Sequence, residues 1–157
     1  MVDGEPTKEV SDPPWSGLHE LLVNGARARL EPGSDADRVA SAVYERFLGV
    51  DRDLQDIVSL WQAVARPDGP LTGAERGLVD NLRRLADRAT PLLRRLSEGV
   101  PGFAAYTNRL HESLRRLDDG EREYFCVGPD SFHTVCSQLH EELLLCLGLD
   151  RRDEPNQ

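Results

Sequence analysis

Residues 72–98 read TGAERGLVDNLRRLADRATPLLRRLSE, and this stretch carries the clearest periodic pattern of the chain. Thr72 and Glu75 have the spacing of a capping box, which satisfies backbone N–H groups at the start of a helix. The apolar residues that follow recur at steps of four and three, as on one face of a packed helix. They are Leu78, Leu82, Leu85, Ala89, Leu92 and Leu96.

Pro91 lies inside this stretch, although a proline in a helix interior costs about 3 kcal/mol. The apolar pattern nevertheless continues in phase across Pro91, which falls on the opposite, solvent-facing side of the helix. We therefore expect one kinked helix from about 72 to 98 rather than two separate helices.

Helical periodicity extends over the rest of the chain, and no stretch shows the sustained β-branched alternation of a strand. Ser34 with Asp37 approximates a capping box, and Gly49 is placed as the left-handed residue just beyond a helix end. Asp51 or Asp53 then caps the next helix. The expected helices span residues 15–31, 34–48, 51–66, 72–98, 103–117 and 129–148, with a short helical turn at 121–127.

The last of these helices has apolar residues over more than half of its circumference. Such a helix must be largely surrounded by protein, so we expect it at the centre of the bundle. Leu139, Leu143 and Cys146 should therefore be inaccessible to solvent.

These patterns predict an all-α fold, a single-domain bundle of about six helices around a central hydrophobic C-terminal helix. We expect the bundle to span residues 14–149. Residues 1–13 are acidic and contain two prolines, which predicts a flexible tail, and residues 150–157 form a second, polar tail.

The 157 residues include 19 Lys and Arg against 28 Asp and Glu, giving a formal net charge of −9. This charge repels phosphate, so nonspecific binding to nucleic acid or an anionic membrane is disfavoured. No apolar run approaches the ~20 residues that cross a bilayer, and the N-terminal residues are acidic where a signal peptide is basic and then apolar. Three cysteines, an odd number, suit a reducing compartment, so we expect a cytoplasmic protein.

The sequence lacks the local motifs of several enzyme classes. It contains neither phosphate-binding glycine loop, and it has no G-x-S-x-G nucleophile turn and no H-E-x-x-H zinc motif. We therefore assign no catalytic residue and favour a protein that is not an enzyme.

His133, Cys136 and His140 lie at steps of three and four, which places all three on one stripe of the last helix. This arrangement suggests a metal site for zinc or a haem, with Cys126 or Asp130 as a fourth ligand. The competing interpretation is structural, with Cys136 as a small core residue and the histidines at the edge of the core.

The helix at 72–98 also carries more arginines than acidic residues. Guanidinium groups bind carboxylates and phosphates in bidentate fashion, so this face is a candidate docking surface for a partner that bears either group. The competing interpretation is an exposed flank paired with neighbouring acids. The candidate residues are Arg83, Arg84, Arg88, Arg94 and Arg95.

We therefore expect a non-enzymatic helical interaction or regulatory protein that binds a protein partner through a helical surface and needs no cofactor. The alternative is a metal- or haem-binding helical sensor that uses His133, Cys136 and His140. The sequence leaves open whether the chain forms a homodimer.

Overall fold

The computed structural model describes residues 29–154, in which all regular secondary structure is helical. The all-α class expected from the sequence is thereby confirmed. The tail expected at 1–13 and most of the helix expected at 15–31 lie outside the described residues. The elements are α2 (Asp35–Val64), α3 (Gly73–Gly99), η1 (Pro101–Phe103), α4 (Ala104–Asp118), α5 (Glu123–Cys126), α6 (Phe132–Leu147) and η2 (Arg151–Asp153).

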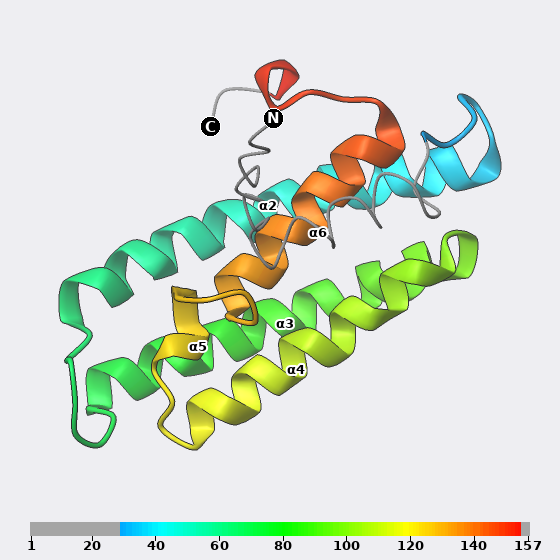
Figure 1. Ribbon diagram of the computed structural model, residues 1–157. Helices are drawn as coiled ribbons and strands as arrows, with labels where there is room; N and C mark the ends of the chain where they lie inside the picture. The colour runs from blue at the N-terminus through cyan, green and yellow to red at the C-terminus, as the bar shows by residue number, and fades with distance from the viewer. Residues whose placement is uncertain (1–28, 155–157) are drawn as a thin grey trace, which may run out of the picture.

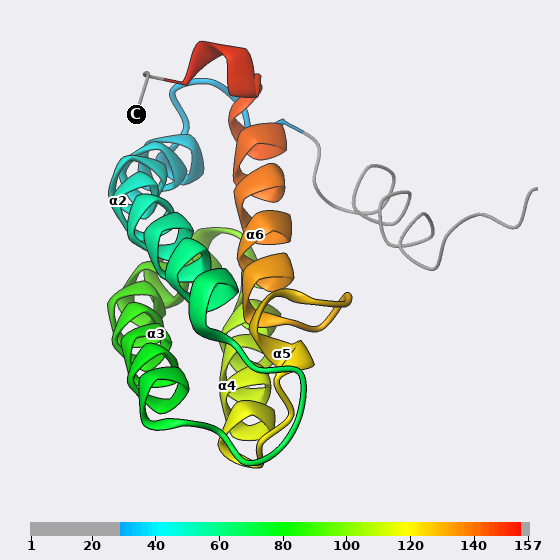
Figure 2. The same cartoon turned by 90° about the vertical axis from the view of Figure 1, so that its left-hand side faces the viewer.

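The four long helices pack in two layers (Figure 1). Figure 2 shows α2 and α6 in one layer and α3 and α4 in the other. Helices α2, α3 and α4 follow one another as antiparallel neighbours, and α6 packs on both α2 and α4. Among residues 29–154, no helix combines the length and the apolar character that crossing a membrane requires.

Helix α2 runs without a break through Gly49, so the helix end expected there is wrong. Gly49 does not have a positive φ, and Asp51 and Asp53 lie within the helix instead of capping a new one. The buried face continues in phase on both sides of Gly49, and this packing outweighs the roughly 1 kcal/mol that a glycine costs inside a helix. The buried apolar residues of this face are Ala40, Val43, Tyr44, Phe47, Val50, Leu54, Val58 and Trp61.

The start of α2 agrees with the sequence. The Ser34 hydroxyl accepts a hydrogen bond from the Asp37 N–H at 3.1 Å. The Asp37 carboxylate in turn accepts one from the Gly33 N–H at 3.0 Å, one residue earlier than in a standard capping box. Both bonds occupy backbone donors that have no partner within the helix.

Helix α3 contains Pro91 in its interior, as expected, with the proline on the exposed side. The Thr72 and Glu75 capping box is also present. The buried face is wider than expected, because Val79 and Ala86 are buried as well, and Leu93 is buried where Leu92 was expected, which is only half-buried. An α-helix has 3.6 residues per turn, so a step of four from Ala89 stays on the face as well as a step of three does.

Ser131 caps the start of α6, where its hydroxyl accepts a hydrogen bond from the Thr134 N–H. Gly148, with φ +64°, caps the end of the helix. Its start is thus later than the expected residue 129. Leu139, Leu143 and Cys146 are at most 1% exposed, which confirms that this helix is largely buried.

The short helix α5 joins α4 to α6 and packs against both. Its Phe125 ring stacks on Trp61 at the end of α2, with ring centroids 3.9 Å apart. This contact closes one end of the bundle and fixes α5 beside the groove described below.

Candidate functional site

The three residues considered for a metal lie along α6 in different surroundings. His133 is half-buried, whereas Cys136 and His140 are buried. Burial raises the pKa of the Cys136 thiol, which disfavours the thiolate that binds a metal. In residues 29–154, no group of three or more His, Cys, Asp or Glu side chains is placed to hold a metal ion. The metal or haem sensor stays a prediction.

The arginines of α3 divide into two groups. Arg83 forms an ion pair with Asp118 of α4 at 2.7 Å, and Arg88 forms one with Asp53 of α2. Arg84 donates to the Asn81 side chain on its own helix. These contacts direct three of the five candidate arginines to neighbours within the bundle.

Arg94 and Arg95 form the second group. Both are exposed, and neither makes an ion pair with any residue in the described part of the chain. They leave a smaller cationic surface near the end of α3 than the sequence suggested.

A groove of about 450 Å³ lies on the other side of the bundle, where α4, α5 and the start of α6 meet. It is open to solvent, and most of the residues that line it have polar side chains. Four lining residues come from one face of α4, at intervals of one, three and four residues. The groove is lined by Asn108, Arg109, Glu112, Arg116, Tyr124, Asp130 and Val135.

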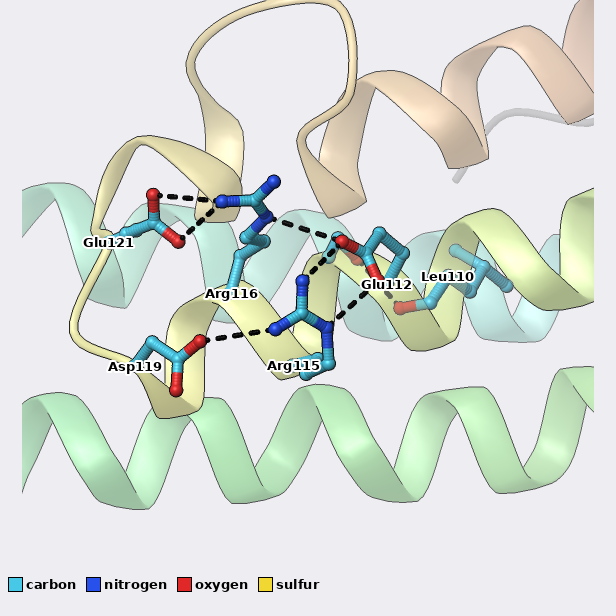
Figure 3. A network of polar contacts seen from close by, with 7 residues as sticks. Leu110, Glu112, Arg115, Arg116, Asp119 and Glu121 are labelled. Atoms are coloured by element: carbon cyan, nitrogen blue, oxygen red, sulfur yellow. Dashed lines mark hydrogen bonds and ion pairs between the residues drawn. The ribbon is translucent and has the colours of Figure 1, made fainter.

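An ion-pair network holds the α4 wall of the groove, as Figure 3 shows. Glu112 accepts hydrogen bonds from Arg115 at 2.7 and 3.0 Å and from the Arg116 Nε at 3.2 Å. The Arg116 Nη1 also donates to Glu121, at 3.3 Å to Oε2. The Arg115 hydrogen bond is the main cause that lowers the pKa of Glu112 to about 2, so this carboxylate stays ionised.

Each of the two groove arginines lies over a tyrosine ring. The Arg116 guanidinium carbon is 5.4 Å from the centroid of the Tyr124 ring, and that of Arg109 is 5.6 Å from the Tyr106 ring. These distances allow cation–π attraction. Tyr106 itself is buried and donates a hydrogen bond to Glu142 of α6, which fixes the ring beneath Arg109.

The groove therefore presents two guanidinium groups, of which Arg116 is held by hydrogen bonds and Arg109 is held less firmly. Arg109 approaches Asp130 at 4.0 Å, a loose ion pair across the groove, and keeps 30% of its side chain exposed. Arg116 uses Nε and Nη1 toward Glu112 and Glu121, which leaves its Nη2 without a hydrogen bond among the described residues. Such a surface suits recognition by hydrogen bonds and by packing on an aromatic ring.

Our sequence interpretation did not identify this groove. Tyr124 and Asp130 come from two short segments that show no periodic pattern, and the turn of the chain after α4 brings them to Arg116 and Arg109. The one available signal was the seven-residue spacing of Arg109 and Arg116, which places both on the same face of a helix. The function has to be inferred from this geometry, since no family model, no curated protein and no solved structure matches the chain.

Proposed function

We propose that this chain is a non-enzymatic helical interaction protein that binds a protein partner at the groove between α4 and α5. The observation that carries the proposal is that Arg109 and Arg116 both line one open groove, each over a tyrosine ring, and that the Tyr124 ring lines the groove as well. Arginine and tyrosine are among the residues that contribute most to binding energy in protein interfaces.

The ion-pair network supports the proposal through its effect on entropy. A long side chain that becomes immobile on binding costs about 0.5–1.5 kcal/mol. Arg116 is already held by Glu112, Glu121 and the ring of Tyr124 before any partner arrives. Part of the entropy that Arg116 would lose on binding is therefore already lost when the chain folds.

The loop before α6 adds an apolar contact point. Val127 has 65% of its surface exposed, more than any other large apolar residue in the described part of the chain. It lies in the same loop as Asp130, which lines the groove. A partner that contacts Tyr124 and Val127 would bury apolar area while its polar groups meet the two arginines.

Affinity capture with three baits tests this proposal. The baits are the unmodified chain, the groove variant Arg109→Ala with Arg116→Ala, and the control variant Arg94→Ala with Arg95→Ala. Both variants lose two exposed or half-exposed arginines from one helix, so their charge change is the same. We expect a specific partner whose recovery, measured by quantitative mass spectrometry, falls at least about tenfold with the groove variant, a loss of about 1.4 kcal/mol.

The control variant should retain recovery within about twofold. A partner lost with Arg94→Ala and Arg95→Ala but retained by the groove variant would contradict the groove and favour the α3 arginines. A chain that captures no protein above a bait-free background would contradict the interaction function itself.

A further inference from the structure

A second polar site lies at the middle of α6, where that helix packs across α2. His140 is buried there, with 5% of its side chain exposed. Its ring lies against the rings of Tyr44 and Phe47 of α2, with centroid distances of 6.2 and 5.8 Å. On one side, the His140 Nδ1 faces the Asp51 carboxylate at 3.9 Å.

The other side of the His140 ring receives a carboxylate from the segment after α6. One oxygen of Glu154, Oε1, accepts a hydrogen bond from the Tyr44 hydroxyl at 2.9 Å and also contacts the His140 Nε2. The Glu154 side chain is only 15% exposed, although the preceding Arg151 and Arg152 are exposed. A single acidic side chain thus enters a recess built by two helices.

Glu154 provides a buried attachment of this segment. Arg151 forms an ion pair with Glu141 of α6, but both side chains are more than half exposed, and exposed pairs of this kind contribute little to stability. Arg152 pairs with Asp150 inside the segment itself. A short segment outside the packed helices opens at a lower free-energy cost than the helices that form the recess.

We propose that Tyr44 and His140 form a carboxylate-binding site that the chain fills with its own Glu154, so that residues 150–154 act as a latch which another acidic peptide segment can replace. The ligand class follows from the geometry, since the Tyr44 hydroxyl, a donor, and the His140 Nε2 converge on the position of one carboxylate oxygen. An amide in the same position would present one oxygen with less charge.

The surrounding groups keep these donors in place. Burial, and next the hydrogen bond to Glu154, raise the pKa of Tyr44, so its hydroxyl retains the proton that it donates. The charged and titratable groups that face His140 come from α2 and from the latch, namely Asp51, Tyr44 and Glu154. The Asp51 carboxylate lies on the opposite side of the ring, 3.9 Å from Nδ1.

The first test compares two full-length variants, Glu154→Gln and Glu141→Gln, by ¹⁵N relaxation. Each substitution removes one carboxylate from a contact between the latch and the helices, but only the Glu154 carboxylate is buried. For Glu154→Gln we expect the order parameters of residues 151–154 to fall below about 0.6, the range of flexible chain. Glu141→Gln should leave them unchanged. Order parameters that stay high in Glu154→Gln would overturn the latch.

The second test measures binding of a carboxylate supplied by a separate chain. A fluorescent synthetic peptide with the sequence of residues 149–157 is titrated into the Glu154→Gln protein. We expect saturable binding, with at least tenfold weaker binding by the same peptide carrying Gln in place of Glu. Adding Tyr44→Phe, which removes one donor and keeps the ring, should also weaken binding. Equal binding of the two peptides, or no binding of either, would overturn the site.

Discussion

Glu75 shows most clearly how a single residue organises this bundle. Its side chain is completely buried, and its carboxylate accepts hydrogen bonds from the Arg122 Nε and Nη2 and from the Thr72 N–H. Arg122 also donates to the carbonyl oxygens of Gly69 and Pro70, at 2.6 and 2.9 Å. One ion pair thus connects the start of α3 to the loop before it and to the residue that precedes α5.

This environment predicts a dependence of stability on pH. The hydrogen bond from Arg122 is the main cause that lowers the pKa of Glu75 from 4.5 to about 2. Because the pKa is lower in the folded chain than in the unfolded chain, the ionised carboxylate stabilises the fold above about pH 4.5. This contribution is lost as the pH falls from 4.5 toward 2.

We therefore expect Glu75→Gln to lower the free energy of unfolding by about 2 kcal/mol at pH 7, and the difference from the unmodified chain to shrink below pH 4.5. Urea unfolding at several pH values measures this. Glu112→Gln is the control, because the pKa of Glu112 is lowered as far but its side chain is exposed, so its removal should change stability little. A loss for Glu75→Gln that is the same at pH 7 and pH 2.5 would contradict the prediction.

At the scale of the helix, α2 and α3 show what periodicity predicts and what it misses. Apolar residues three and four apart predicted helical structure along both, although α2 was expected as two helices, and Ser34 and Thr72 correctly marked where α2 and α3 start. Gly49 misled, because a glycine followed by Asp51 has the same local chemistry whether a helix ends there or continues. The packing of α2 along α3 determines that the helix continues, and the residues that make this contact lie far apart in the sequence.

Gly49 offers a direct test of this interpretation. A Cβ added at Gly49 would meet only the Arg88 side chain, at 3.9 Å, so alanine fits without strain. Because alanine favours a helix interior over glycine, Gly49→Ala should stabilise the chain by about 0.5–1 kcal/mol and raise the melting temperature by about 1–4 °C.

Gly148→Ala is the matched control for Gly49→Ala. Gly148 has φ +64°, and an added Cβ would lie 2.5 Å from the Arg29 side chain, so alanine should destabilise there. Calorimetry on both variants measures the two shifts. A lower melting temperature for Gly49→Ala would show that the glycine is required at its position in α2.

At the scale of the whole molecule, one continuous core joins the four long helices and α5. Leu139 lies in this core and is 1% exposed. Leu139→Ala should therefore cost about 2–5 kcal/mol, measured by chemical denaturation. A loss below about 1 kcal/mol would mean that the surroundings of α6 collapse into the space. The exposed Leu145 on the same helix provides the control, and Leu145→Ala should cost far less.

The same scale explains why the fold was easier to predict than the sites. A buried helical face repeats within one segment, whereas the groove combines α4 with Tyr124 and Asp130 from later segments. His140 was noticed for its spacing to Cys136, yet its closest polar contact is Glu154, from a segment interpreted as a polar tail. Such contacts depend on the tertiary arrangement of segments that are distant in sequence, and no local sequence pattern predicts that arrangement.

The unbroken α2 also determines how the molecule moves in solution. Thirty residues at a rise of 1.5 Å form a rod of about 45 Å, somewhat longer than the diameter of about 39 Å of a sphere with the roughly 15 Å radius of gyration of a compact chain of this length. With α3 lying antiparallel beside it, the long axis is shared by two rods (Figure 1). We therefore expect the described part of the chain to rotate somewhat faster about this axis than end over end, a difference that a hinge at Gly49 would have reduced.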